Sequence, residues 1–177
     1  MAIYIILIPF LPQFGWWVKH DSPVAAILPP KPNPTVVPKP APVVQGDTLF
    51  IPRLDMQKSI FGGGKANLHK GVWHVPHTST PDKGGNTVLV GHRFTYKDPT
   101  GAVFYHLDKV QKDDAISVQW QGKMYNYHVT DIKVVPDTEL SVQDNTSDPQ
   151  LTIYTCTPLW SVTHRLVIVA KPTGVDL

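Results

Sequence analysis

The sequence has very little cysteine and almost no net charge, and each shortage excludes a class of protein. Only one of its 177 residues, Cys156, is a cysteine, so no disulfide can form within the chain and packing alone must hold the fold. Lysine and arginine number 16 against 14 acidic residues, which gives a formal net charge of +2. No basic run or basic patch interleaved with aromatics accompanies that balance, so we predict no nucleic-acid partner.

Residues 1–20 are expected to form a membrane anchor or a signal-like segment. Their long uncharged run would span roughly 25 Å as a helix, against a hydrocarbon core of about 30 Å. Pro9 and Pro12 would interrupt that helix, and no lysine or arginine precedes the run. A tryptophan pair followed by a lysine at 16–19 resembles an interfacial belt, which favours an anchor over a stray hydrophobic tail.

Residues 21–46 are predicted to form a proline-rich linker. Eight prolines lie between Pro23 and Pro42, a density that favours extended polyproline II with a reach of up to roughly 60 Å. A ligand for a proline-recognising domain is the alternative, but the position between an apolar segment and a globular region favours a stalk.

Residues 47–177 have the pattern of a mainly β domain, with 42% hydrophobic content over the whole chain to supply a core. A short helix is predicted at 102–107, and Gln121–Gly122 indicates a tight hairpin. The spacing fits either a closed barrel or a sandwich. Strands are predicted at residues 48–51, 87–90, 116–120, 124–129, 132–135, 151–155 and 165–170.

Cys156 ends one of these runs and has the setting of a nucleophile. An unperturbed thiol with a pKa near 8.5 is only a few per cent thiolate at neutral pH, so catalysis needs a neighbouring cation or imidazole. Antiparallel pairing across the connection 157–164 would bring Arg165 to the same rim, where a guanidinium suits an oxyanion rather than a proton transfer. A buried, inert cysteine is the alternative.

Among eight histidines, His92 is the best candidate for the base. It follows the run 87–90 and Gly91, which permits close backbone approach, whereas no β-run delivers His164 to a rim. His74 and His77 form a His-x-x-His pair, but no further cysteine completes a ligand set, so we predict no metal.

The residues around Cys156 resemble a known signature. The sequence Thr-Ile-Tyr-Thr-Cys at 152–156 is similar to the Thr-Leu-x-Thr-Cys motif of sortases, the membrane-anchored cysteine transpeptidases of bacterial surfaces, with Ile153 in place of leucine. The resemblance covers roughly residues 47–172. Other similar stretches are 51–55, 85–93, 104–110 and 163–167.

The resemblance implies a closed eight-stranded β-barrel with one or two short helices and no cofactor. It also implies Cys156 as nucleophile, His92 as general acid and base, and Arg165 as the group that steadies the oxyanion. The flanking residues are expected to bind substrate: Thr155, Tyr154, Gly91 and His164.

The implied reaction cleaves an Leu-Pro-x-Thr-Gly-like sorting signal at the threonine carbonyl and transfers the acyl group to an amine, either a cell-wall precursor or a pilin lysine. Partners would be surface proteins or pilins, and the location a single-pass membrane protein with an extracellular catalytic domain. The context resembles pilin-type and class D or E sortases; a housekeeping type is favoured because no lid motif or C-terminal membrane segment stands out. A mainly hydrolytic peptidase of the same fold and a non-catalytic surface barrel are the alternatives.

Overall fold

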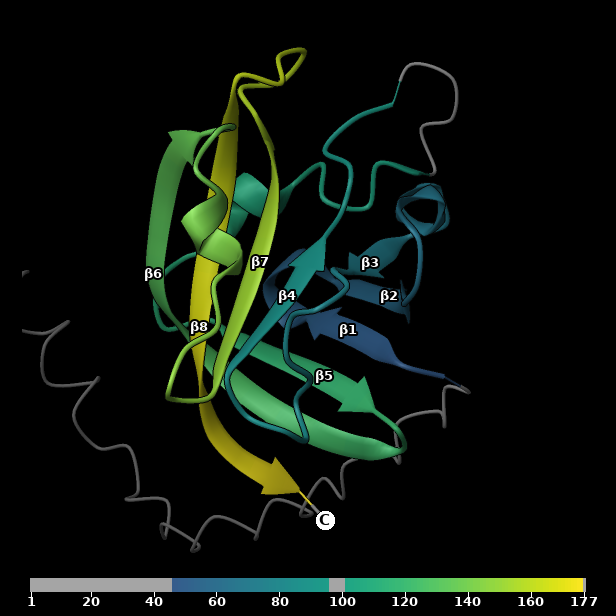
Figure 1. The fold of residues 1–177 in the computed structure, drawn as a ribbon, viewed down its shortest axis with the longest axis vertical. Helices are drawn as coiled ribbons and strands as arrows, with labels where there is room; N and C mark the ends of the chain where they lie inside the picture. Colours follow the sequence, from purple (N-terminus) through teal and green to yellow (C-terminus); the bar gives the residue numbers. More distant parts are fainter. Residues whose placement is uncertain (1–45, 96–100, 177) are drawn as a thin grey trace, which may run out of the picture. The chain divides into compact units, whose positions relative to one another are not determined.

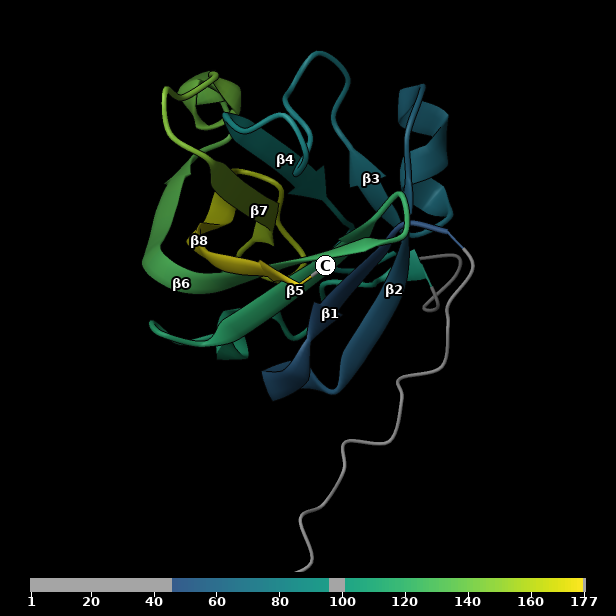
Figure 2. The same cartoon turned by 90° about the horizontal axis from the view of Figure 1, so that it is seen from below.

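The computed structural model describes residues 46–95 and 101–176, which form a closed eight-stranded β-barrel in the order β1-β2-β3-β4-β7-β8-β6-β5 (Figures 1 and 2). β1 pairs with β5 as well as with β2, and this pairing closes the sheet on itself. The barrel expected from the resemblance is therefore confirmed, and the sandwich is excluded. The strands are β1 (Thr48–Ile51), β2 (Met56–Phe61), β3 (Val72–His74), β4 (Asn86–Val90), β5 (Ala115–Trp120), β6 (Lys123–Pro136), β7 (Gln150–Thr157) and β8 (His164–Asp176).

The hairpin between β5 and β6 shows how local sequence sets the register. Gln121 and Gly122 both adopt positive φ, 50° and 82°, as a two-residue type I′ turn requires. The turn pairs Trp120 with Lys123, and strict alternation then turns Ile116 and Val118 into the barrel. The predicted hairpin is confirmed.

The barrel interior is filled by apolar side chains from every strand, whereas Val88 and Val90 of β4 belong to a separate cluster on the outer face. Burial of each such side chain contributes about 1.5–3 kcal/mol. Two of the fillers, Phe104 and Leu107, come from the connection between β4 and β5 rather than from a strand. Fully buried members include Leu49, Ile51, Ile116, Leu151, Ile153 and Ile168.

The helix predicted at 102–107 is wrong. Residues 103–106 form a turn that leads into the 3₁₀ helix η5 (Leu107–Lys109). The cause is tertiary, because the Phe104 N–H donates to the His92 carbonyl at 3.0 Å instead of to a helical partner. The other 3₁₀ helices in the described part of the chain are η2 (Pro52–Leu54), η3 (Lys65–His69) and η6 (Leu140–Gln143).

Other strand predictions need smaller corrections. Residues 124–129 and 132–135 were expected as two strands, but they belong to the single strand β6, which has a register shift between Val129 and Asp131. β2 and β3 were not predicted at all.

The predicted anchor and nearly all of the predicted linker lie outside the described residues. Within 46–95 and 101–176, no helix is long and apolar enough to cross a membrane.

We predict that Gly91→Ala destabilises the barrel by about 1–3 kcal/mol, because overpacking forces neighbours to move. An added Cβ would lie 2.5 Å from Cδ2 of Phe104 and 2.6 Å from Cγ2 of Val103. Chemical denaturation measures the loss. The matched control is Gly62→Ala, where a Cβ meets no heavy atom within 4 Å; equal stability of the two variants would contradict the packing role.

Candidate active site

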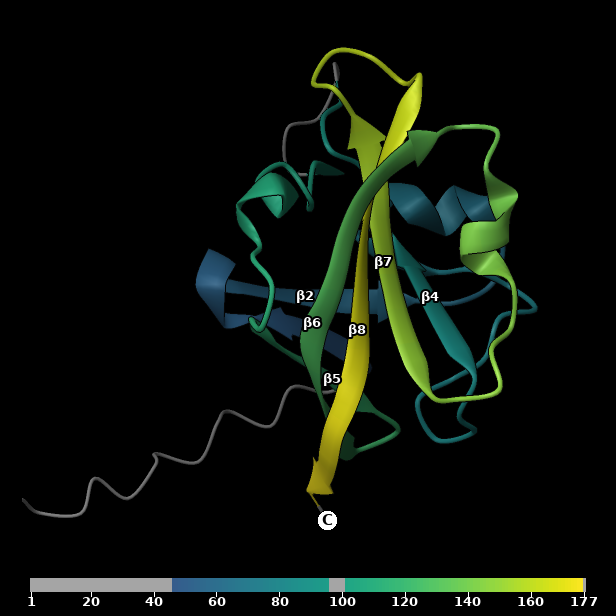
Figure 3. The same ribbon diagram turned by 90° about the vertical axis from the view of Figure 1, so that its left-hand side faces the viewer.

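Strand β7 is central to the site because it pairs with β4 in parallel and with β8 antiparallel, and the three strands lie side by side (Figure 3). Leu151 and Ile153 of β7 point into the barrel core. Alternation along the strand therefore turns Tyr154 and Cys156 to the outer face. Arg165 of β8 is the register partner of Cys156, and His92 lies two residues after Val90 of β4, which packs in a cluster with Tyr154. The three catalytic candidates therefore lie on one outer face.

Cys156 and Arg165 are register partners across β7 and β8. Side chains directly opposite each other in an antiparallel pair share a face, with Cβ atoms roughly 4.5–5.5 Å apart. The thiol of Cys156 is partly buried and free of any disulfide. The aliphatic part of the Arg165 side chain is therefore its direct neighbour.

His92 is held beside the same strand end by backbone contacts. The Gly91 N–H donates to the Tyr154 carbonyl at 3.4 Å, and the Thr155 hydroxyl donates to the Gly91 carbonyl at 2.8 Å. These bonds extend the β4–β7 pairing past the end of β4. They deliver His92 to the pocket that Cys156 also lines.

The pocket has a volume of about 380 Å³, and Cys156, His92 and Arg165 all line it. Its apolar wall is the outer face of β4 with the neighbouring segments: Val75 and Val90 pack there with Leu68 and Trp73. Two cations, Lys65 and Arg165, face the pocket, and no acidic side chain is among its described lining residues.

The surroundings of His92 favour its neutral form. Burial is the largest cause that lowers the pKa of His92 below its ordinary value of 6.5, and the positive charges of His69 and Lys65 lower it further. The His69 and His92 rings are 5.0 Å apart between centroids. His92 Nε2 is buried and has no hydrogen-bond partner within the described ranges, so no neighbour there competes for its proton.

The Arg165 head group is held by its own loop. Its Nη1 donates to the carbonyls of Val162 at 2.7 Å and His164 at 3.0 Å, and its Nη2 lies 4.0 Å from Asp137 Oδ2. Both hydrogen bonds use Nη1, and Nη2 makes only the long ion pair with Asp137. A guanidinium has five N–H donors, so Arg165 can also donate to an oxyanion.

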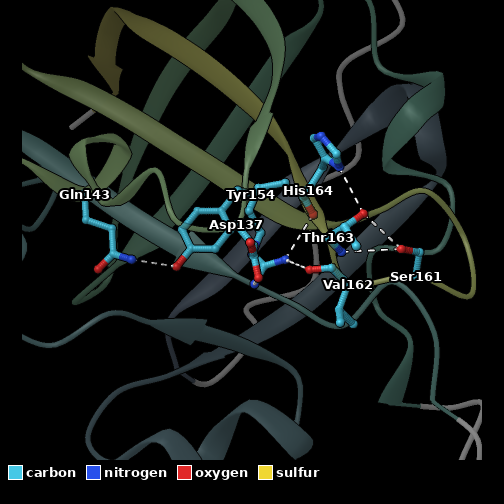
Figure 4. A network of polar contacts seen from close by, with 8 residues as sticks. Asp137, Gln143, Tyr154, Ser161, Val162, Thr163 and His164 are labelled. Carbon is cyan, nitrogen blue, oxygen red and sulfur yellow. Dashed lines mark hydrogen bonds and ion pairs between the residues drawn. The ribbon is translucent and has the colours of Figure 1, made fainter.

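Tyr154 borders the pocket as a neutral hydroxyl. Burial raises its pKa, and its oxygen accepts a hydrogen bond from Gln143 Nε2 at 3.0 Å (Figure 4). Gln143 ends η6, whose position depends on a buried amide: Asn86 Nδ2 donates to the carbonyls of Val142 at 3.2 Å and Asp144 at 2.9 Å. The Asn86 side chain on β4 thus holds η6 in place, and η6 positions Gln143 at one side of the pocket.

The side chains of two predicted substrate-binding residues, His164 and Thr155, are not free to face the pocket. His164 is exposed, contacts Thr163 Oγ1 through Nδ1 at 3.0 Å, and is not among the described lining residues. Alternation from Arg165 turns it to the opposite side of β8. Thr155 lines the pocket, but its side chain is 1% exposed and engaged with Gly91.

Sequence reasoning missed one whole wall of the pocket. Lys65 and Leu68 come from η3, and Trp73 comes from β3, both in a region where no helix or strand is predicted from the sequence. Trp73 and Val75, two positions apart, are a weak period-two signal for a strand there. No cluster of three or more histidine, cysteine, aspartate or glutamate side chains suited to a metal occurs in the described part of the chain.

Comparison with known proteins agrees with this architecture. The Sortase domain family matches residues 49–173. Sortase A of Listeria monocytogenes is 33% identical over 125 residues, which are 70% of this chain and 54% of that protein. Sortase SrtE1 of Streptomyces coelicolor is 31% identical over 140 residues, 70% of this chain and 39% of that protein. The chain therefore spans about half or less of these curated relatives.

Solved structures give the same result. The crystal structure of Listeria monocytogenes sortase A superposes with a TM-score of 0.66 at 30% identity, covering 73% of this chain and 88% of that one. Streptococcus agalactiae sortase C1, solved in complex with MTSET, has a TM-score of 0.67 at 31% identity, covering 74% and 70%. The family match covers most of the barrel, and a thiol, an imidazole and a guanidinium line one pocket. The chain therefore belongs to the sortase family.

Proposed function

We propose that the chain is a cell-surface transpeptidase in which Cys156 is the nucleophile, His92 the general acid and base, and Arg165 the oxyanion donor. The observation that carries the proposal is the single pocket that all three side chains line, on the outer face of β4, β7 and β8. Family membership supports the reaction class.

In the first half-reaction, the Cys156 sulfur attacks the threonine carbonyl carbon of a sorting signal similar to Leu-Pro-x-Thr-Gly. The thiol proton passes to His92 as the S–C bond forms, and His92 then gives it to the departing amine as the C–N bond breaks. Arg165 donates to the oxygen that becomes negative, an interaction strongest in the transition state. The product is a thioester on Cys156.

In the second half-reaction, an acceptor amine attacks the thioester. His92 takes its proton and returns it to the Cys156 sulfur, which restores the resting enzyme. A neutral resting imidazole suits both steps, and the lowered pKa of His92 supports that form at neutral pH. With unperturbed pKa values, thiolate and imidazolium would coexist in only about 1% of molecules, and a lowered His92 pKa makes that pair rarer still.

The pocket wall suits an apolar peptide segment beside the scissile bond. Leu68, Trp73 and Val90 offer a surface for leucine-like and proline-like side chains, and about 380 Å³ accommodates a few such groups. Gln143 and Tyr154 supply polar groups on the other side. We assign the clients to surface proteins or pilins and the acceptor to a cell-wall precursor or a pilin lysine.

The proposed location is the outer side of the cell membrane, with residues 1–20 as a single-pass anchor and 21–46 as a stalk. The catalytic region proposed for 47–177 would then reach clients held at the same surface.

The chemical roles are tested by trapping the acyl-enzyme with a sorting-signal peptide and weighing the intact protein. Cys156→Ala should give no adduct, and Arg165→Ala should lower kcat by about 10²–10³, the cost of one oxyanion donor. Arg165→Lys, which keeps the charge but not the planar fork, is the matched control. Added amine should convert the thioester to the amide product. Release of the free acid alone would identify a hydrolase. A Cys156 thiol that forms no adduct with the peptide would identify a non-catalytic barrel.

The pH dependence tests His92 separately. We expect NMR titration of the imidazole to give a pKa below 6.5, and the acid limb of kcat/KM to follow it. Removing a nearby positive charge favours imidazolium, so Lys65→Gln should raise this pKa and move the acid limb to higher pH. Lys123→Gln, in the β5–β6 hairpin, should change neither. A His92 pKa above 6.5 would refute the burial argument.

A further inference from the structure

Arg93 is a buried cation immediately after His92. It is 6% exposed, and its guanidinium makes two directed contacts. Nη1 donates to the Thr157 hydroxyl at 2.8 Å, and Nη2 pairs with Asp108 Oδ1 at 3.2 Å. Asp108 belongs to η5, so the guanidinium joins three segments of the chain.

The hydrogen bond between Arg93 and Thr157 connects the two segments that carry His92 and Cys156. Arg93 follows His92 in the chain, and Thr157 follows Cys156 in β7. One hydrogen bond between residues 64 positions apart therefore ties the neighbour of the imidazole to the neighbour of the thiol. On the other side of His92, the Gly91 N–H donates to the Tyr154 carbonyl and the Gly91 carbonyl accepts from the Thr155 hydroxyl, and these bonds restrain the same two segments.

A buried guanidinium is costly unless it is paired, so its contacts must be definite ones. The planar fork of arginine can hold a hydroxyl and a carboxylate in fixed directions at once, which the single ammonium of lysine cannot reproduce. Arg93 is not among the described residues that line the catalytic pocket. Its contacts therefore act on the segments that carry the reacting groups and not on substrate.

We infer that Arg93, through its hydrogen bond to Thr157, is a positioning residue that fixes the His92 imidazole relative to the Cys156 thiol. The inference rests on the proposed function of those two groups. A misplacement of about 1 Å between reacting groups costs up to roughly 100-fold in rate. The Arg93–Thr157 hydrogen bond can therefore have a large effect on the rate.

The test is Thr157→Val, which has nearly the same shape but lacks the acceptor oxygen, alongside Thr157→Ser, which retains it. We expect Thr157→Val to lower kcat for thioester formation about 10- to 100-fold with little change in KM, and Thr157→Ser to stay within about threefold of wild type. Arg93→Lys should show the Thr157→Val defect. The double variant Arg93→Lys/Thr157→Val should be no slower than the worse single variant, because both remove one interaction.

A stability control separates positioning from general loosening. Val118→Ala opens a cavity in β5, a strand that does not pair with β4, β7 or β8. It should lower Tm yet leave kcat near wild type when assayed well below Tm. Wild-type kcat in Thr157→Val, or a loss no larger than that of Val118→Ala, would overturn the inference.

The His92 imidazole gives a readout that needs no peptide. If the Thr157 bond holds the ring in its buried site, Thr157→Val should raise the imidazole pKa, measured by NMR, toward 6.5, while Thr157→Ser and Val118→Ala should not. An unchanged pKa in Thr157→Val would also overturn the inference. Failure of the wild-type protein to form a thioester would refute the proposed function instead, and the titration would still decide whether the bond positions His92.

Discussion

The double pairing of β7, parallel to β4 and antiparallel to β8, is the constraint on which the site depends. Leu151 and Ile153 anchor β7 in the barrel core, so a register slip of one residue would expose them and bury Cys156. The apolar residues of the strand therefore hold the thiol on the outer face. Hydrophobic packing inside the barrel fixes the geometry of polar chemistry outside it, opposite Arg165.

Much of the barrel could be predicted because its strongest strands carry local signals. The run that contains Leu151 and Ile153 and the turn at Gln121–Gly122 specify themselves through apolar content and turn chemistry. β2 could not be recognised, because only Met56 and Ile60 are buried and its polar middle is stabilised by pairing with β1. The helix predicted near Phe104 failed because a distant carbonyl takes its N–H.

The same division applies to the site. Cys156, His92 and Arg165 could be proposed from sequence because each stands at or just beyond a strand end, and connection length places two of them together. The pocket wall formed by η3 and β3 could not, because the three-residue strand β3 is stabilised by its pairing with β2 and β4 and carries little local signal. His164 shows the limit of proximity in sequence: one step along a strand reverses the direction of a side chain.

Arg93 and Arg165 both lie near Cys156, but their charges are paired differently. The Arg93 side chain is buried and pairs with Asp108 at 3.2 Å, so its charge is used within the fold. The Arg165 side chain is less buried and lies 4.0 Å from Asp137, a longer and weaker pairing that leaves more positive potential at the pocket. That potential suits an oxyanion. The pKa of His92 is lowered first by burial and then by the charges of His69 and Lys65. Burial of His92 and the loose pairing of Arg165 therefore place a neutral imidazole and a positive guanidinium at the same pocket.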